Sequence, residues 1–439
     1  MFNGCQGTKS ASHVFNRNLR QKLEMFGMKR SITDHGLFVY QFDDGSYLYM
    51  STATDDLLTS AATYGHIGKL IEFLKQFFTL TVQKGSVLDF LGMRIIQSEL
   101  GISIDQAEYV YEMVHEYFNS ENLDYVKTAS TPLRPDNDYE KELYEAPRQT
   151  DEEFALSCIK HRGSYRKHIG KLVYAAIMTR FDIAYGTQRL SEFNVRPNAP
   201  AWEGITRIMR YLAGDIVRPL FYPRVPLDGK TTICAQLTPE KRDCLTLSNF
   251  LNLFTDSEYA RDPATRHTYF CTNITMLGVS VHFKVKKSTS VLPETTSAEV
   301  YASFRGSKYL QPIVSIVRQM GIIVEEPVQT HIDNQATVCI IASERMTPRS
   351  RHLDIPIAYL HERKHRGDIG ENQITTHVQM ADIGTKQLVP MVFKRQRNWL
   401  CGHRFYPPEG TAHYKLLGLQ FYEKSYVHIR DNTKMPDED

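Results

Sequence analysis

Long hydrophobic runs and a net charge of one sign are both missing from this chain of 439 residues. No apolar stretch approaches the ~20 residues that a bilayer-spanning helix needs, and residues 1–18 lack the apolar centre of a signal peptide. We therefore expect an intracellular protein, of the cytoplasm or nucleus, that has no membrane partner. The 52 Lys+Arg and 50 Asp+Glu leave a net charge of +2. This balance excludes a simple polybasic nucleic-acid binder but permits local basic grooves.

Closely spaced cysteine pairs of the C-x-x-C type are also missing. The seven cysteines are an odd number, and none lies in a C-x-x-C pair. We therefore expect neither a disulfide framework nor a zinc ribbon, and a reducing compartment is the default.

What the chain does have is globular composition, with 42% hydrophobic and 11% aromatic residues. Its length suggests roughly two to four domains. Two stretches rich in Pro and charge look like linkers. The predicted organisation is therefore a mixed domain (1–128), a linker (129–155), a helical segment (156–221), a linker (222–248), an α/β domain (249–395) and a C-terminal tail (396–439).

Periodicity predicts an α+β pattern in the first segment. Gly36–Met50 predicts a β-hairpin with its turn at Asp43–Gly45, and Val87–Ile96 predicts a strand. The second segment predicts helices only. The third predicts strands that precede Asp256 and Asp333, with a helix over about 298–320 between them. The predicted fold class is therefore α+β or α/β multidomain.

Carboxylates gather at two places. Asp55–Asp56 lies between two strand-like runs, where a tight hairpin could hold a divalent metal, although such pairs also occur in ordinary turns. In the third segment, four acids lie at strand ends or near a helix start, namely Asp256, Glu299, Asp333 and Asp382. Four such oxygen donors suit two Mg²⁺ ions that hydrolyse a phosphodiester. N-caps and turns are the alternative explanation for each acid separately.

The order of motifs resembles the C-terminal part of a copia-type LTR-retrotransposon Pol polyprotein, over about residues 4–395. YLYMSTATDDLLTS is similar to the palm hairpin of reverse transcriptase with its Y-x-D-D box. YRKHIGKLVYAAIMTRFDIAY and WEGITRIMRYLAG resemble the family's two following helices. FTDSEYARDPATR, TTSAEVYA, HIDNQATV, SRHLDIP and ADIGTK resemble successive blocks of ribonuclease H. The resemblance implies a partial reverse-transcriptase palm, a helical thumb/connection and a ribonuclease H-like mixed-sheet domain.

Carried over residue by residue, the resemblance implies catalytic, metal-binding roles for six acids. Asp55 and Asp56 match the paired palm aspartates, whereas Asp256, Glu299, Asp333 and Asp382 match the ribonuclease H ligands of two Mg²⁺ (or Mn²⁺) ions. The expected partner is an RNA–DNA hybrid or another nucleic acid. The expected nucleic-acid-binding residues are Lys286, Lys287, Arg349, Arg351 and His352. The alternative for the basic stretch that contains the last three is a solvated helix face.

Several departures from the family pattern matter. Ala53 replaces the tyrosine of the Y-x-D-D box, and the chain begins just before the hairpin, without fingers or a third palm aspartate. We therefore expect an N-terminally truncated Pol fragment with no polymerase activity, unless a missing N-terminal Pol portion supplies these parts in trans. A homodimer is the other expected protein partner. Only Gln379 and Met380 separate the "HV" pair from Ala381–Asp382, a shortening that could displace Asp382. Two functions therefore remain open, namely residual cleavage of RNA in RNA–DNA hybrids and an inert transposon remnant that at most binds nucleic acid.

Overall fold

The computed structural model describes residues 11–54, 56–119, 123–224, 231–238, 241–247, 250–343, 352–406 and 411–413. The chain divides into two units. The first contains the residues up to Leu91 together with Lys308–Val324, and the second contains Gly92–Ser307 and the residues from Glu325 onward. None of the helices in these ranges is both long and apolar enough to cross a membrane.

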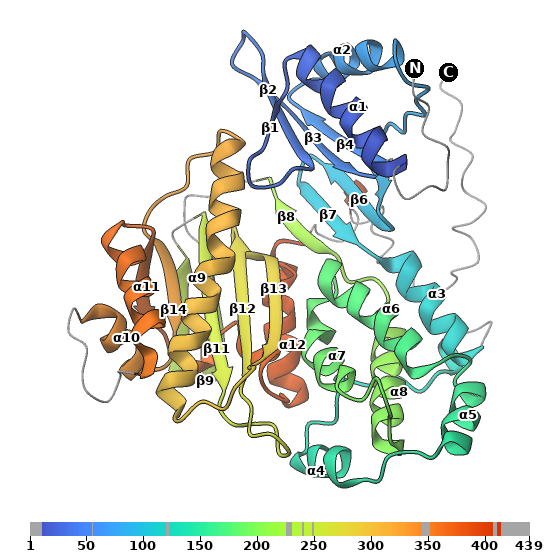
Figure 1. The fold of residues 1–439 in the computed structure, drawn as a ribbon, viewed down its shortest axis with the longest axis vertical. Helices are drawn as coiled ribbons and strands as arrows, with labels where there is room; N and C mark the ends of the chain where they lie inside the picture. The colour runs from blue at the N-terminus through green and yellow to red at the C-terminus, as the bar shows by residue number, and fades with distance from the viewer. Residues whose placement is uncertain are drawn as a thin grey trace. The chain divides into compact units, whose positions relative to one another are not determined.

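The first unit is an antiparallel sheet with two helices (Figure 1). Its strand order is β1-β2-β3-β4. Its elements are α1 (Ala11–Phe26), β1 (Lys29–Arg30), β2 (Leu37–Gln41), β3 (Tyr47–Ala53), β4 (Asp56–Ala61), α2 (Tyr64–Lys75) and β5 (Val87–Phe90). Leucines of both helices pack with Leu48 and Met50 of β3 in one core. The predicted hairpin is confirmed, because β2 pairs with β3 and Gly45 has the positive φ of +80° that its turn requires.

The second unit contains a helical body and a mixed sheet. Strands β6 and β7 precede the helices of the helical body and β8 follows them, and the three strands pair antiparallel. Its elements are β6 (Met93–Ser98), β7 (Gly101–Asp105), α3 (Ala107–Phe118), η1 (Leu123–Tyr125), α4 (Asn137–Glu145), α5 (Asp151–Lys160), α6 (Tyr165–Met178), η2 (Phe181–Ile183), α7 (Ala184–Ser191), α8 (Ala199–Ala213) and β8 (Leu220–Pro223). The prediction of helices alone in the second segment therefore holds until β8 begins. The strand predicted over Val87–Ile96 is instead two strands, because Leu91 and Gly92 both have positive φ and turn the chain between them.

The stretch predicted as a linker, 222–248, contains a hairpin of β9 (Thr231–Thr238) and β10 (Lys241–Leu247). A disulfide joins Cys234 to Cys244 across this hairpin. Both strands contribute apolar side chains to the main core, including Ile233 and Leu245. Neither strand was predicted, because apolar residues in this stretch of sequence do not alternate regularly.

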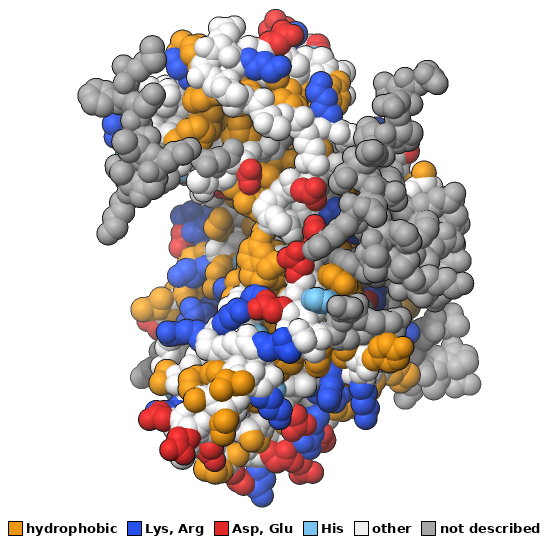
Figure 2. Space-filling view, turned by 90° about the vertical axis from the view of Figure 1, so that its right-hand side faces the viewer, with side chains coloured by type: hydrophobic (Ala, Val, Ile, Leu, Met, Phe, Trp, Pro, Cys, Tyr) orange, Lys and Arg blue, Asp and Glu red, His pale blue; other side chains and the backbone are white. Residues whose placement is uncertain are grey.

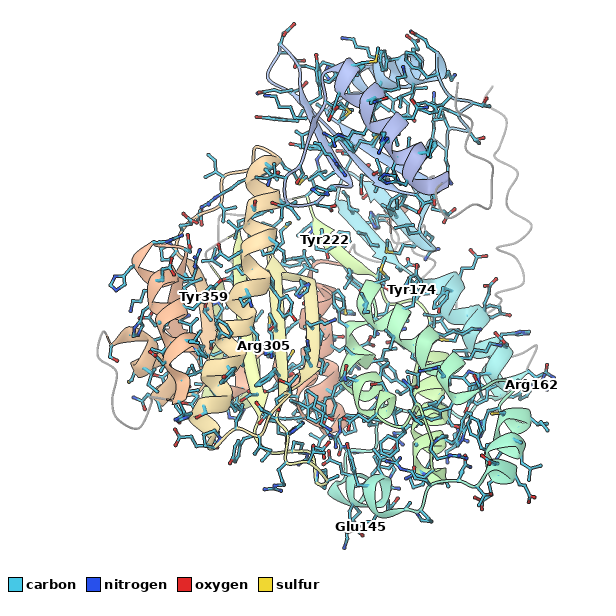
Figure 3. All side chains as sticks on the ribbon, viewed as in Figure 1. Glu145, Arg162, Tyr174, Tyr222, Arg305 and Tyr359 are labelled. Carbon is cyan, nitrogen blue, oxygen red and sulfur yellow. A yellow bond between two sulfur atoms is a disulfide. The ribbon has the colours of Figure 1, made fainter. Side chains whose placement is uncertain are left out.

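The mixed sheet has the order β13-β12-β11-β14-β15, in which β11, β14 and β15 run parallel. Its elements are β11 (Leu251–Glu258), β12 (Tyr269–Met276), β13 (Val279–Lys287), α9 (Thr295–Gln319), β14 (Val328–Ile332), α10 (Gln335–Ala342), α11 (Asp354–His365), β15 (Ile369–Gln373), η4 (Thr376–Val378), η5 (Asp382–Gly384), α12 (Pro390–Leu400) and η6 (His403–Phe405). Helix α9 crosses one face of this sheet (Figure 1). Arg305 of α9, labelled in Figure 3, lies over the Phe270 ring, and Phe304 packs edge-on against Tyr359 of α11. The predicted α+β multidomain class is confirmed.

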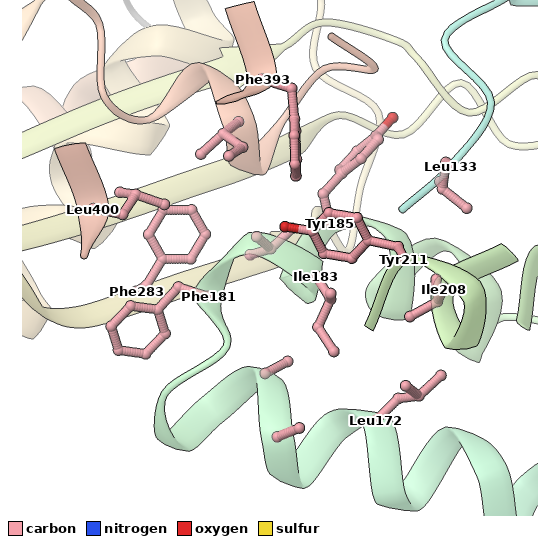
Figure 4. Packing of buried hydrophobic residues seen from close by; sticks show 14 of the residues in the cluster. Leu133, Leu172, Phe181, Ile183, Tyr185, Ile208, Tyr211, Phe283, Phe393 and Leu400 are labelled. Carbon is pink, nitrogen blue, oxygen red and sulfur yellow. The ribbon is translucent and has the colours of Figure 1, made fainter. Parts of the chain in front are cut away.

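One continuous core joins the helical body to the mixed sheet (Figure 4). Phe181 stacks on Phe283 of β13 with ring centroids 5.8 Å apart, and Tyr211 of α8 packs edge-on against Phe393 of α12. Inside this core, the buried Arg180 donates two hydrogen bonds to the carboxylate of Asp182, at 3.0 and 2.8 Å. Tyr211 also donates to Asp182. A buried charge is tolerated here because it is fully paired.

We predict that Asp182→Asn destabilises the second unit. Burial alone would raise the pKa of Asp182, but the Arg180 guanidinium and the Tyr211 hydroxyl outweigh burial and lower the pKa from 3.8 to about 2. The depressed pKa contributes about 2 kcal/mol of stability above pH 4, which is lost as the pH falls towards 2. The variant also leaves Arg180 unpaired, so we expect a loss of about 3–5 kcal/mol at pH 7.

Urea unfolding of wild type and variant, followed by circular dichroism at pH 6 and pH 3, tests this prediction. The difference in unfolding free energy should shrink by about 1 kcal/mol at pH 3, where wild type itself loses part of the ion pair. The control is Asp151→Asn, because Asp151 is 91% exposed and pairs only with a surface arginine. A constant difference at both pH values would contradict the assignment of the pKa shift to Asp182.

Candidate metal centre

Three carboxylates converge at one end of the mixed sheet. Strands β11 and β14 are parallel neighbours in which Phe254 is paired with His331, so Asp256 and Asp333 each follow this pair by two residues. Glu299 comes from the second turn of α9. Ligand oxygens of Asp256, Glu299 and Asp333 all lie within 4.8 Å of one another, and this is the one such group of acids, histidines or cysteines in the described residues. Two of these three acids are buried, and Asp333 is half-buried.

The close approach of α9 to β11 places Glu299. A Cβ on Gly306 would lie 2.6 Å from the Thr255 methyl group, so only glycine permits this distance between helix and strand. The backbone N–H and the hydroxyl of Ser257 both donate to Oε1 of Glu299, at 3.1 and 2.7 Å. The other oxygen, Oε2, is buried without a hydrogen-bond partner in the described part of the chain. That oxygen therefore remains available to a cation.

Asp382 adjoins this group on a short 3-10 turn, η5. Gln379, just before it, donates to the Thr255 carbonyl oxygen at 3.0 Å and accepts from the N–H of Ala381, which ties the segment to β11. A Cβ on Gly384 would lie 2.3 Å from the Cys271 sulfur, so η5 sits directly on β12. Asp382 therefore lies beside β11 and β12, although it is not one of the three acids whose oxygens all lie within 4.8 Å of one another. The "HV" pair before it lies in the 3-10 turn η4.

Lys386 connects Asp382 to Asp256. Its ammonium group lies 2.7 Å from Oδ1 of Asp382 and 3.5 Å from Oδ2 of Asp256. The hydroxyl of Thr385 also donates to Asp256. Neither Thr385 nor Lys386 was predicted from the sequence. The one signal was the i,i+4 spacing of Asp382 and Lys386, which places an acid and a base on the same side of a helical turn.

The electrostatics of the site favour a cation. Burial, together with the charges of neighbouring acids, raises the pKa values of Asp256, Glu299 and Asp382. Burial would lower the pKa of Lys386, but the carboxylates of Asp256 and Asp382 reverse this and raise it. All donors are carboxylate oxygens, the ligands that Mg²⁺ and Mn²⁺ prefer. Together with the unpartnered oxygen of Glu299, this donor set fits a divalent metal.

The acids predicted for the polymerase lie elsewhere. Asp56 begins β4 opposite Ala53, and Thr54 takes the positive φ of 52° that a tight hairpin needs. The side chain of Asp56 is exposed. Asp55 lies outside the described residues.

The residues predicted to contact nucleic acid differ in their exposure and in their partners. Lys287 forms ion pairs with Glu192 and Asp262, so two carboxylates already engage its ammonium group. Lys286 is exposed at the end of β13. His352 lies 2.7 Å from the hydroxyl of Ser297, two residues before Glu299. Arg349 and Arg351 lie outside the described residues.

Solved structures similar to part of this chain include LC11-RNase H1, isolated from compost. The match has a TM-score of 0.26 and 18% identity, and it covers 31% of this chain and 93% of that protein. LC11-RNase H1 in complex with an RNA/DNA hybrid matches with a TM-score of 0.25 and 16% identity over the same shares.

Sequence comparisons cover more of the chain. Residues 3–134 match the family described as reverse transcriptase (RNA-dependent DNA polymerase). The retrovirus-related Pol polyproteins from transposons RE1 and RE2 of Arabidopsis thaliana are each 26% identical over 88% of this chain. The Pol polyprotein from transposon TNT 1-94 of Nicotiana tabacum is 24% identical over 81% of it. The chain spans about a quarter (24%) of the length of each of these relatives. It is therefore related to the Pol polyproteins of copia-type retrotransposons.

Proposed function

We propose that this chain cleaves the RNA strand of RNA–DNA hybrids with the help of divalent cations. The observation that carries the proposal is the convergence of Asp256, Glu299 and Asp333 within 4.8 Å at one end of the mixed sheet. These three residues would hold a Mg²⁺ or Mn²⁺ ion, and Asp382 with Asp256 would hold a second. The relatives of this chain are retrotransposon Pol polyproteins, which supports a nucleic acid as the substrate.

The bound ions would supply an activated water and stabilise the leaving oxygen of the phosphodiester. The protein's own residues fix the geometry that this chemistry needs. Ser257 holds one oxygen of Glu299 with two hydrogen bonds and leaves the other oxygen directed to the site. Thr385 holds one oxygen of Asp256. A hybrid duplex would be recognised by its shape and by its 2′-hydroxyl groups rather than by its base edges.

We further propose that nucleotide polymerisation is not an activity of this chain by itself. A palm active site needs several carboxylates around two metal ions. Ala53 stands where the Y-x-D-D box has its tyrosine, and Asp56 is exposed on its hairpin, whereas Asp55 lies outside the described residues. Primer extension after mixing with an intact N-terminal Pol portion would reveal a polymerase assembled from two chains.

A second candidate is a folded remnant without catalysis. The observation that favours it is the position of Lys386, whose ammonium group lies within ion-pair distance of both Asp256 and Asp382. An internal lysine can neutralise buried carboxylates and thereby stabilise the fold without any metal. The two candidates differ in whether the acids bind Mg²⁺ and in whether the folded protein cuts a hybrid.

We predict that Asp333→Asn abolishes cleavage of a labelled RNA–DNA hybrid in Mg²⁺ or Mn²⁺. Loss of a residue that only supports a metal ligand typically costs 10–100-fold, so loss of a ligand should reduce the rate by more than about 100-fold. The matched control is Asp354→Asn, an exposed acid at the start of α11 outside the cluster. Absence of cleavage by folded wild type, with no thermal stabilisation by Mg²⁺, would support the inert remnant.

We predict that Lys386→Met lowers stability in EDTA and that Mg²⁺ restores it. Removing the ammonium group leaves Asp256 and Asp382 without compensating charge. Because the Lys386 side chain is 31% exposed, we expect a loss of about 1–3 kcal/mol, less than for a fully buried pair. Mg²⁺ would then stabilise the variant more than wild type, since the ion replaces the lost charge.

Urea unfolding with EDTA and with a Mg²⁺ titration measures this effect. Lys394→Met is the control, because Lys394 is an exposed cation on α12 that makes no ion pair in the described residues. Equal Mg²⁺ stabilisation of Lys386→Met and wild type would show that Lys386 and the metal do not share the same carboxylates.

A further inference from the structure

A cavity in the helical body is lined by three cations and one acid. It has a volume of about 300 Å³ and lies between α8 and the chain segment that precedes α4. Its lining residues are Lys127, Thr128, Ala129, Ser130, Glu203, Arg207 and Arg210. Three of these carry positive charge and one carries negative charge. A volume near 300 Å³ is at the lower end of the range for ligand pockets.

Helical spacing explains how the cations gather. Arg207 and Arg210 are three residues apart on α8, so they share one face of the helix. Glu203 lies four residues before Arg207, yet no ion pair within 4 Å joins it to any of the three cations. In the residues that the structure describes, neither Lys127, Arg207 nor Arg210 forms a salt bridge.

Several arginines of this body are paired with acids, although Arg148, Arg162 and Arg166, like Arg207 and Arg210, form no salt bridge within the described residues. Arg180 pairs with Asp182, Arg189 with Glu140, and Arg218 with Asp215. The cations of α11 are paired as well, each with an acid of α11 or of the residues that follow it. The face shown in Figure 2 likewise carries basic and acidic side chains close together rather than a broad field of one sign. What distinguishes Lys127, Arg207 and Arg210 is that all three line one cavity.

A hydrogen bond positions the side chain of Arg207, and one of its N–H donors is left without a partner in the described residues. One terminal nitrogen donates to Oγ1 of Thr131 at 3.0 Å, and the Thr131 hydroxyl donates in turn to the Leu133 carbonyl oxygen. The Nε–H group of Arg207 is buried and has no partner within the described part. Burial, together with the nearby charge of Arg134, lowers the pKa of Arg207. An anion would satisfy the free donor and relieve this repulsion.

The segment that frames this cavity also extends to the metal centre. Thr131, Pro132 and Leu133 line a second, smaller cavity together with Lys386 and Gln387, which directly follow η5. The residue that orients Arg207 and the lysine that bridges Asp256 and Asp382 therefore border the same space.

We propose that the cavity formed by Lys127, Arg207 and Arg210 binds a backbone phosphate of the nucleic acid whose RNA strand is cut at the Asp256 cluster. This inference rests on the proposed function. A planar guanidinium group can donate two hydrogen bonds to one phosphate. The positive charge of two arginines and one lysine is more than enough to neutralise one backbone phosphate. Such a contact carries no sequence information, but it fixes the position of the duplex relative to the acids.

The test is binding of a labelled RNA–DNA hybrid in EDTA, where no cleavage occurs, as a function of salt. The variant is Lys127→Gln/Arg210→Gln, because both side chains are exposed and their loss does not disturb the core. Two lost phosphate contacts should weaken binding at 0.15 M salt by roughly 5-fold each and reduce the salt slope by about 1 each. Arg207→Lys should retain charge but lose the two-pronged contact and weaken binding by a smaller factor.

The matched control is Lys160→Gln/Arg166→Gln, which removes the same charge from exposed positions on α5 and α6. An equal loss in the control would show a general charge effect and would overturn the proposal, as would unchanged binding by the cavity variant. Inorganic phosphate at millimolar concentration is a further arm. If it stabilises wild type but not the variant while the hybrid binds both equally, the cavity takes free phosphate and the backbone assignment is wrong.

Failure of this proposal and failure of the proposed function can be told apart. If wild type cuts the hybrid and the cavity variant binds it normally, only the cavity assignment is wrong. If wild type binds the hybrid through the cavity but never cuts it, the cavity assignment stands and the cleavage proposal falls. Absence of any hybrid binding by the folded wild-type chain would overturn both.

Discussion

The shared core between the helical body and the mixed sheet is the contact on which the second unit depends. Phe181 and Phe283 stack across this boundary, and Tyr211 meets Phe393 beside the buried Arg180–Asp182 pair. Since a well-packed interior has few voids, it fixes the relative position of the elements that enclose it. The helices and the sheet therefore act as one body, and residues contributed by both can form a site of fixed geometry.

The metal centre, unlike the apolar core, brings several negative charges together in a buried place, which destabilises the fold unless they are compensated. Asp256, Glu299 and Asp382 are nearly inaccessible to water. Burial raises their pKa values, and the charge of Asp333 raises all three further. Folding such a group requires positive charge at the same point. Lys386 supplies one charge from the chain itself. It contacts Asp382 and Asp256, whereas the unpartnered oxygen of Glu299 is left over. Lys386 thus compensates part of the negative charge of the buried carboxylates, and a bound cation would compensate the remainder.

The sequence predicted those features that depend on local spacing. Alternation and turn residues predicted the β2–β3 hairpin, and the acids at the ends of two strands predicted that Asp256 and Asp333 would meet. The helix predicted over about 298–320 is α9, from Thr295 to Gln319, with Gly321 just beyond its end. These features follow from periods of two and 3.6 residues and from turn chemistry, which one sequence contains.

Features that depend on distant partners escaped prediction. Lys287 belongs to a basic pair in the sequence, yet the fold brings Glu192 and Asp262 to its ammonium group. The role of Gln379 in holding Asp382 near β11 depends on the Thr255 carbonyl oxygen, 124 residues away. The cationic cavity needed Lys127 and two residues of α8 to meet around one space. Residue spacing along the chain does not predict such long-range contacts, because they arise only when separate elements pack together.

A chain with almost equal numbers of acids and bases can still bind a polyanion if its cations differ in how well they are paired. An ion pair lowers the free charge that a cation offers to a phosphate, since the bound carboxylate must first be displaced or shared. On this basis Arg363, Lys364 and Arg366, at or just beyond the end of α11, are weak phosphate ligands. Lys127, Arg207 and Arg210 form no salt bridge within the described residues and line one cavity with a single acid. The gathering of three such cations around one space, rather than net charge, therefore marks the surface where a phosphate would bind.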